Sequence, residues 1–195
     1  MKFQYTDEQL NNLNQDYAVY SVNEEFSSRK KTKQVVVKTN IDPKNETNTI
    51  TTSDGQEFRV LATKSDPKTG FDGLAVAPIV NGEPDYKNVA VIAAGTDPGS
   101  PTKIDVGTAV AERESGLSPQ YYVADRFVKE IMDDPRYEVS QLSGYSQGSY
   151  MLKVGAKYHI PTTTFNAWFF YRSLSNEEKA FIDKNPAMFI DYRRN

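Results

Sequence analysis

The sequence contains no cysteine and a single histidine, His159. The missing cysteines exclude disulfides, thiolate metal sites and a cysteine nucleophile. Because tetrahedral zinc sites draw on several Cys or His ligands, one histidine also argues against a zinc site built only from protein ligands. We therefore expect no metal site in this chain.

Long apolar runs are missing as well. No stretch reaches the ~18 apolar residues that a membrane span needs, and residues 1–17 lack the apolar core of a signal peptide. We expect a protein without a membrane span. We place it in the cytoplasm unless it leaves the cell by a route that reads a signal elsewhere in a longer protein.

The chain has no excess of basic residues, since 23 Lys and Arg stand against 26 Asp and Glu and the net charge is −3. Nucleic-acid binding needs a clustered basic surface, so we expect no nucleic-acid partner. The one basic cluster, residues 29–33, comes shortly after two glutamates, and such short runs are usually solvated. We expect this cluster to be an exposed loop.

The length of 195 residues fits one α/β domain. Apolar positions and turn signals predict the strands and helices along the chain. A capping box at Thr6 and Gln9 opens the first helix. The segment after Ala94, through Asp105 and Gly107, is expected to be a long polar loop. The expected strands lie in 34–39, 58–63, 73–80, 88–94, 137–142, 162–170 and 187–192, and the later helices in 118–132, 150–158 and 175–184.

The order of these elements predicts the sheet. The closely spaced strands up to residue 80 predict antiparallel hairpins, and Asn81-Gly82 is a strong turn signal. The apolar run 88–94, a helix and the strand near 137–142 form a strand, crossover and strand, which predicts parallel pairing. We therefore expect a mostly parallel sheet with flanking helices and antiparallel strands at its N-terminal end.

The stretch between the strand near 137–142 and the helix near 150–158 contains Gly144-Tyr145-Ser146-Gln147-Gly148, a G-x-S-x-G motif. In a nucleophile elbow this motif turns sharply between a strand and a helix and exposes the serine hydroxyl above the sheet edge. Glycine and serine also make ordinary turns. The strand and helix on either side favour the elbow, so Ser146 is our candidate nucleophile.

Gly95-Thr96-Asp97 at the end of a buried strand, followed by the SGYSQGS elbow, resembles the lipase branch of the α/β-hydrolases. The resemblance covers about residues 73–192 and implies an α/β-hydrolase-type fold. It implies that Ser146 is the nucleophile and that backbone N–H groups of Thr96 and Gln147 form the oxyanion hole. Asp105 matches the family's loop aspartate loosely, and a solvated loop carboxylate is the equal alternative.

The chain departs from the family in its base and acid. His159 lies thirteen residues after Ser146, at the far end of the expected helix and out of reach of the serine. Asp191 lies inside the last expected strand, whereas the family's acid follows that strand. We therefore expect residues 1–195 to be one domain, the front part of a longer hydrolase whose remaining sequence brings the acid and the histidine.

The resemblance implies a serine-dependent lipase or esterase that cleaves carboxylic esters of lipids and needs no cofactor. The alternative is a catalytically incomplete pseudo-enzyme that binds a partner protein. The aromatic run 168–171 lies where this fold places its substrate cleft, and alternate residues of a strand face opposite sides. We expect Trp168, Phe169 and Tyr145 to contact the substrate, and peripheral lipid contact fits this face.

The chain is also similar to lipase-like proteins of Gram-positive bacteria, some of which are toxins exported by type VII secretion. This narrower similarity implies export by a route other than the Sec pathway. It also implies an inhibitor or immunity protein that covers Ser146.

Overall fold

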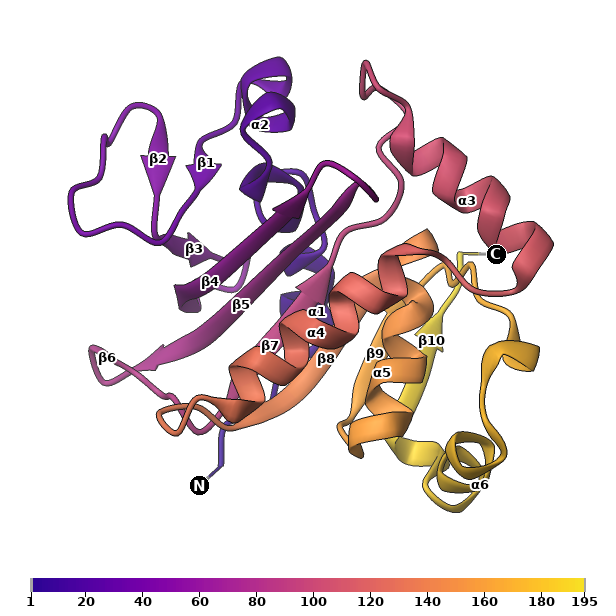
Figure 1. Ribbon diagram of the computed structural model, residues 1–195. Coiled ribbons are helices and arrows are strands. Elements are labelled where there is room, and N and C mark those ends of the chain that lie inside the picture. The colour runs from indigo at the N-terminus through magenta and orange to yellow at the C-terminus, as the bar shows by residue number, and fades with distance from the viewer. Residues whose placement is uncertain (1, 195) are drawn as a thin grey trace.

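The computed structural model describes residues 2–194, so Met1 and Asn195 of the expected domain lie outside the described residues. One mixed sheet forms the centre, in the order β10-β9-β8-β7-β5-β4-β3, with β6 paired to β5 (Figure 1). Its strands are β3 (Thr49–Thr51), β4 (Glu57–Asp66), β5 (Phe71–Val80), β6 (Glu83–Pro84), β7 (Val89–Ala93), β8 (Val139–Tyr145), β9 (Thr162–Phe165) and β10 (Phe189–Tyr192).

Strand direction divides this sheet into two parts. Strands β7 to β10 pair in parallel, while β3, β4 and β5 pair antiparallel and β5 runs antiparallel to β7. The Asn81-Gly82 turn has positive φ at both residues, 53° and 81°, as a tight hairpin turn requires. The predicted α/β class, with parallel strands following an antiparallel N-terminal part, is confirmed.

Helices lie on both faces of the sheet (Figure 1). One face packs against the N-terminal helices through a core that includes Leu10, Phe26 and Phe58. The other packs against α4 and α5 through Phe127, Met151 and their neighbours. The helices are α1 (Asp7–Leu13), α2 (Glu24–Lys30), α3 (Ile104–Ser115), α4 (Gln120–Asp133), α5 (Met151–Tyr158) and α6 (Asn176–Lys184), with short 3-10 turns η1 (Val19–Val22), η2 (Ser146–Tyr150), η3 (Tyr171–Ser173) and η4 (Pro186–Met188).

Local capping signals predicted helix starts well. Thr6 and Gln9 form the expected capping box at the start of α1, and Ser175 with Glu178 forms another at α6. Strand β7 is buried along its whole length, as a strand covered on both faces requires. These elements depend on short-range patterns, which is why the sequence alone located them.

Three expectations about local structure are wrong. The basic cluster begins inside helix α2, which ends at Lys30. Residues 104–115 form helix α3 where a polar loop was expected, because buried polar contacts replace the missing apolar stripe. Strand β9 ends at Phe165, and a left-handed residue, Asn166 with φ 51°, turns the chain before the aromatic run. In addition, the expected strand at 34–39 is shortened to β1 (Gln34–Val35), which pairs with β2 (Glu46–Thr47).

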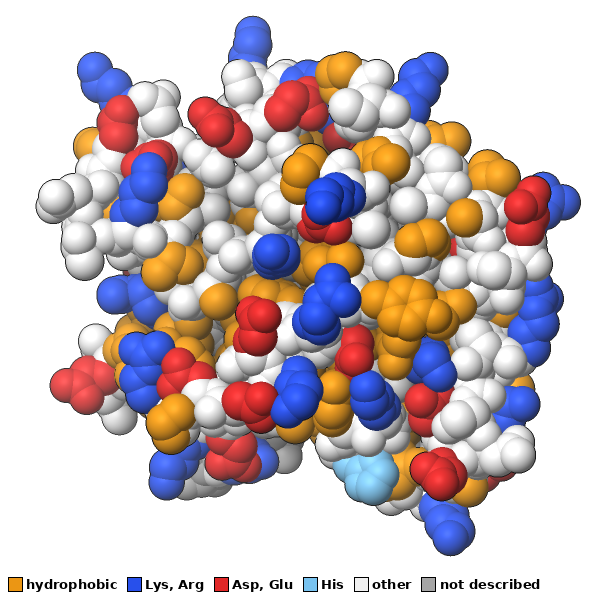
Figure 2. Space-filling model, in the orientation of Figure 1, with side chains coloured by type: hydrophobic (Ala, Val, Ile, Leu, Met, Phe, Trp, Pro, Cys, Tyr) orange, Lys and Arg blue, Asp and Glu red, His pale blue; other side chains and the backbone are white. Residues whose placement is uncertain are grey.

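None of the helices in the described part of the chain combines the length and apolar character that a bilayer span requires. Charged side chains of both signs are interspersed over the face in Figure 2. That face carries no large area of one charge sign.

Candidate functional site

Ser146 sits at the junction of strand β8 and the turn η2, at the carboxyl edge of the parallel strands. Its φ is 49°, in the left-handed region that a non-glycine residue rarely adopts. Such strain persists where the surrounding structure enforces it, and it is common at functional sites. The sharp strand-to-helix turn predicted from the motif is therefore present.

The two glycines of the motif are required by close backbone packing. A Cβ on Gly144 would lie 2.1 Å from the carbonyl oxygen of Gly148, and one on Gly148 would lie 2.7 Å from that of Ala93. Backbone atoms cannot move aside as a flexible side chain can. The turn thus packs against its own strand and against β7, with Ser146 between the two glycines.

The side chain of Gln147 is buried and fully hydrogen-bonded. Its Nε2 donates to Thr96 Oγ1 at 2.8 Å and to the Asp105 carbonyl at 3.2 Å, and its Oε1 accepts from the Ala109 backbone N–H at 3.1 Å. The hydroxyls of Thr108 and Ser118 also donate to Oε1. Gln147 therefore joins the elbow to the loop after β7 and to helix α3.

The proposed oxyanion donors, Thr96 and Gln147, lie on these two joined segments. Among residues 2–194, neither backbone N–H donates a hydrogen bond to another backbone group or to a side chain. Unpaired donors of this kind are available to a ligand oxygen. The structure brings Thr96, Ser146 and Gln147 together through the Thr96–Gln147 hydrogen bond.

The loop that carries Thr96 is held on both sides. The Gly95 N–H donates to the Tyr20 hydroxyl at 3.1 Å, and the Asp97 N–H donates to Asp105 Oδ2 at 2.9 Å. The Asp97 carboxylate pairs with Arg29 of α2. Arg29 was expected to be solvated and instead fixes this loop.

Asp105 is buried, so the solvated alternative is excluded. Its carboxylate accepts from the Asp97 N–H and from Gln120 Nε2 at 2.7 Å. Burial raises the pKa of Asp105 to about 6, although these two hydrogen bonds act to lower it. Asp105 orients the Thr96 loop through Asp97 and lies on helix α3.

Two further carboxyls near this region are buried. Burial raises the pKa of Asp72 to about 7, with hydrogen bonds from Ser65 and Asn23 opposing the rise. Burial also raises the pKa of Glu112 to about 8, and neither carboxyl oxygen of Glu112 has a hydrogen-bond partner among the described residues. Glu112 is a buried acid on α3 that no sequence pattern indicated.

His159 does not take part in the site. It caps the C-terminal end of α5, with φ 59°, and its ring stacks on Phe181 with 3.8 Å between the ring centroids. Figure 2 shows the histidine at the lower edge of the molecule. His159 lies just before the start of β9, whereas Ser146 follows the end of β8, which runs parallel to β9, so the two lie at opposite edges of the sheet. The prediction that His159 lies too far away to be the base agrees with this placement.

Asp191 lies in β10, as expected, and its carboxylate is already engaged. It accepts from Thr164 Oγ1 at 3.0 Å and from the Ala167 N–H at 3.1 Å, and it pairs with Arg193 at 2.7 Å. These contacts fix the chain after β9. They give Asp191 a structural role.

The aromatic run leaves the sheet directly beside the elbow. The Trp168 N–H donates to the Ser146 carbonyl at 3.0 Å, and the Trp168 side chain is 43% exposed. Phe169 is half-buried. The run is not a strand, so the argument from alternating faces does not apply. Trp168 still lies next to Ser146, and its role in substrate contact remains a prediction.

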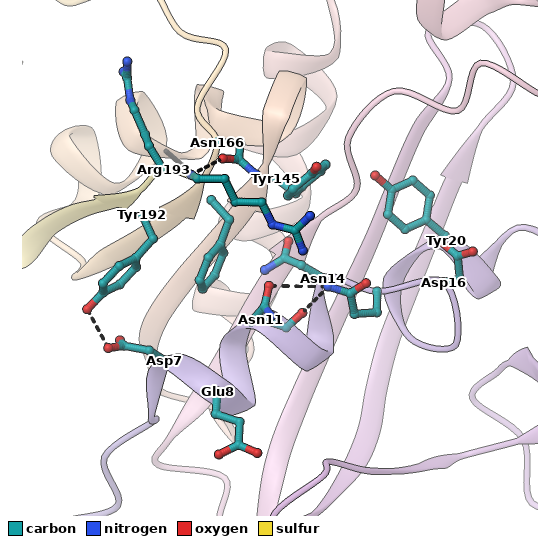
Figure 3. Close-up of a pocket in the computed structure, with 13 residues that line it drawn as sticks. Asp7, Glu8, Asn11, Asn14, Asp16, Tyr20, Tyr145, Asn166, Tyr192 and Arg193 are labelled. Carbon is teal, nitrogen blue, oxygen red and sulfur yellow. Dashed lines mark hydrogen bonds between the residues drawn. The ribbon is translucent and has the colours of Figure 1, made fainter.

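A cavity of about 690 Å³ opens beside the elbow (Figure 3). It lies between helix α1 and the carboxyl ends of β8, β9 and β10, where Tyr145, Phe165 and Tyr192 contribute side chains. Tyr145 was predicted to contact substrate, whereas no sequence pattern indicated Tyr20 or Asn14 as residues of a site. In the part of the chain that the structure describes, no cluster of three or more His, Cys, Asp or Glu residues is arranged to hold a metal ion.

No protein-family model, no curated protein and no solved structure gives a significant match to this chain.

Proposed function

We propose that this protein is a serine hydrolase that cleaves a carboxylic ester of a lipid, with Ser146 as the nucleophile. The observation that carries the proposal is the strained φ of Ser146 between two glycines that backbone contacts require. A serine held in this conformation between a strand and a helix matches the geometry of a nucleophile elbow. An ordinary turn would not need contacts this close on both sides.

In the proposed mechanism, Ser146 Oγ attacks the ester carbonyl and the backbone N–H groups of Thr96 and Gln147 stabilise the oxyanion. The Oγ proton passes to a base, which then protonates the leaving alcohol. Water hydrolyses the acyl-enzyme and regenerates the serine. Because His159 stacks on Phe181 at the other end of α5, the proposal assigns the base to a histidine outside this sequence.

The strained turn at Ser146 also supports the alternative, which is a pseudo-enzyme of this architecture that binds a partner protein. A serine without a base reacts slowly, although a preformed oxyanion hole still accelerates hydrolysis by ~10³-fold over water. The two functions therefore differ in whether Ser146 becomes reactive once a base is supplied.

Imidazole added to the solution can supply that base. We expect imidazole to raise the rate of p-nitrophenyl ester hydrolysis and of fluorophosphonate labelling for the unaltered chain, and to raise neither for Ser146→Ala beyond imidazole alone. Ser149→Ala is the matched control, because Ser149 lies three residues away and its buried hydroxyl has no hydrogen-bond partner in the described part of the chain. It should behave as the unaltered chain. Equal rates for the unaltered chain and Ser146→Ala would support the binding protein.

A further inference from the structure

The cavity beside the elbow shares its walls with the proposed catalytic residues. Tyr145 lines it and precedes Ser146, and the Tyr20 hydroxyl in its wall accepts the hydrogen bond from Gly95, the residue before Thr96. Ser146 itself does not line the cavity. A group bound there would therefore be a neighbour of the ester bond at Ser146.

The cavity lies where open α/β sheets bind ligands, outside the carboxyl ends of parallel strands. Its volume of about 690 Å³ is within the range of small-molecule sites. A single monosaccharide or a group of similar size fits such a volume.

The charged residues that line the cavity are of both signs, and most of them already have a polar or charged partner. Asp7 accepts from the Tyr192 hydroxyl at 2.5 Å, Arg193 pairs with Asp191, and Asp16 lies 3.8 Å from Lys30. A cavity that selects a phosphate or a carboxylate needs an excess of positive charge. The balance here favours a neutral ligand.

Amide groups and aromatic rings make up most of the remaining lining. Amides donate and accept hydrogen bonds without charge, and rings offer flat apolar faces. In Figure 3 the Tyr192 ring and the Tyr20 ring lie at opposite ends of the cavity with Tyr145 between them. A sugar or cyclic polyol presents hydroxyls at its edge and C–H groups on its faces, so it complements both. The amides come from Asn11, Asn14, Gln15 and Asn166.

One buried acceptor in the cavity wall has no donor within the residues that the structure describes. Asn14 is 2% exposed, and its Nδ2 donates to the Leu10 carbonyl and to Ser143 Oγ, both at 2.8 Å. Its Oδ1 has no partner among the described residues. A buried acceptor without a donor is costly. A ligand hydroxyl is the neutral donor that would satisfy it.

We propose that this cavity binds a neutral polyhydroxylated ring, a sugar or cyclic polyol, as the alcohol part of the ester that Ser146 cleaves. The binding site stands on the cavity alone, while its position in the substrate rests on the function proposed above. The substrate class is thus a fatty acyl ester of a sugar or polyol.

Binding is tested without turnover, on the Ser146→Ala protein by amide NMR titration. The probes are methyl β-D-glucopyranoside, methyl β-D-galactopyranoside, N-acetylglucosamine and myo-inositol, with glycerol 3-phosphate as the anionic comparison. We expect at least one neutral probe to shift the amides of Tyr145, Asn166 and α1. No shift there with any neutral probe, or a stronger response to glycerol 3-phosphate, would overturn the proposal.

Tyr145→Phe sharpens the test, because Tyr145 lines the cavity and its hydroxyl makes no hydrogen bond to another of residues 2–194. Loss of one hydrogen bond to a sugar should raise the Kd about fivefold. Tyr122→Phe on α4 is the control, since Tyr122 is 59% exposed and does not line the cavity. An equal Kd for Tyr145→Phe and Tyr122→Phe would contradict the assignment.

Turnover in the presence of imidazole then separates this proposal from the one on which it rests. Tyr145→Phe should raise KM for sucrose monolaurate about fivefold more than KM for p-nitrophenyl laurate, which has the same acyl chain. Sugar binding without Ser146-dependent turnover of either ester would overturn the hydrolase and keep the site. Turnover with equal KM changes for both esters would overturn the sugar site and keep the hydrolase.

Discussion

The elbow and helix α3 meet at the carboxyl edge of the sheet, but different forces hold them. The elbow packs backbone against backbone, and its buried side chain Gln147 has every polar atom paired. Helix α3 buries polar residues, among them Glu112, which has no hydrogen-bond partner within residues 2–194, while Val106 and Val110 are 39% and 53% exposed. Steric necessity therefore fixes the elbow, whereas α3 packs through buried polar groups, among them Glu112, whose pKa burial raises.

The same substitution should have opposite effects in these two regions. Gly144→Ala places a Cβ 2.1 Å from the Gly148 carbonyl oxygen, so we expect a loss of ~3 kcal/mol or more in the free energy of unfolding. Gly107→Ala on α3 meets no atom within 4 Å, and alanine favours a helix over glycine. It should stabilise the protein by ~0.5–1 kcal/mol.

Urea denaturation of both variants measures this contrast. A Gly144→Ala protein as stable as the unaltered chain would show that the turn is loose. In that case the strained conformation of Ser146 would not be enforced by its surroundings.

The second expected effect concerns the free energy of unfolding, which should depend on pH through Glu112 of α3. Burial raises the pKa of Glu112 to about 8 in the folded chain, against an ordinary value of 4.5. The folded state then keeps a proton that the unfolded state releases, so this group lowers stability as pH rises from about 4.5 to about 8. Glu112→Gln imitates the protonated acid at every pH. It should stabilise the protein by ~2 kcal/mol at pH 8 and change little at pH 4.

Urea denaturation between pH 4 and 9 measures this effect. Glu114→Gln is the control, because Glu114 lies on the same helix and is exposed. If Glu112→Gln gave the same change at pH 4 and pH 8, the buried carboxyl would be charged in the folded state. Helix α3 would then not respond to pH through Glu112.

The sequence predicted the elbow but not α3, and the contrast above explains why. The glycines, the strand and the helix around Ser146 are short-range signals, because the turn geometry itself demands those residue types. Helix α3 is stabilised by contacts of Asp105 with Gln120 and of Thr108 with Gln147, which join distant parts of the chain. A local sequence pattern does not indicate contacts between residues that are far apart in the chain.

The same distinction, between short-range sequence patterns and contacts across the fold, applies to the other residues of the site. The position of Thr96 shortly after a buried strand followed from the apolar run before it, and His159 was placed correctly at the end of α5 by counting residues along a helix. Arg29 and Tyr20 hold the Thr96 loop from the N-terminal segment, more than sixty residues away. Their roles follow from tertiary packing, and the aromatic run was misassigned because the left-handed Asn166 ends β9.

The smallest expected effect isolates the strain at Ser146. Ser146→Gly and Ser146→Ala both remove the hydroxyl, but only glycine adopts a φ of 49° without steric cost. Relief of that cost exceeds the greater flexibility that glycine gives the unfolded chain, so Ser146→Gly should be ~0.5–1 kcal/mol more stable than Ser146→Ala. Both variants should lose the imidazole-dependent hydrolysis. Equal stability of the two variants, measured by urea denaturation, would mean that the elbow stores no strain at its serine.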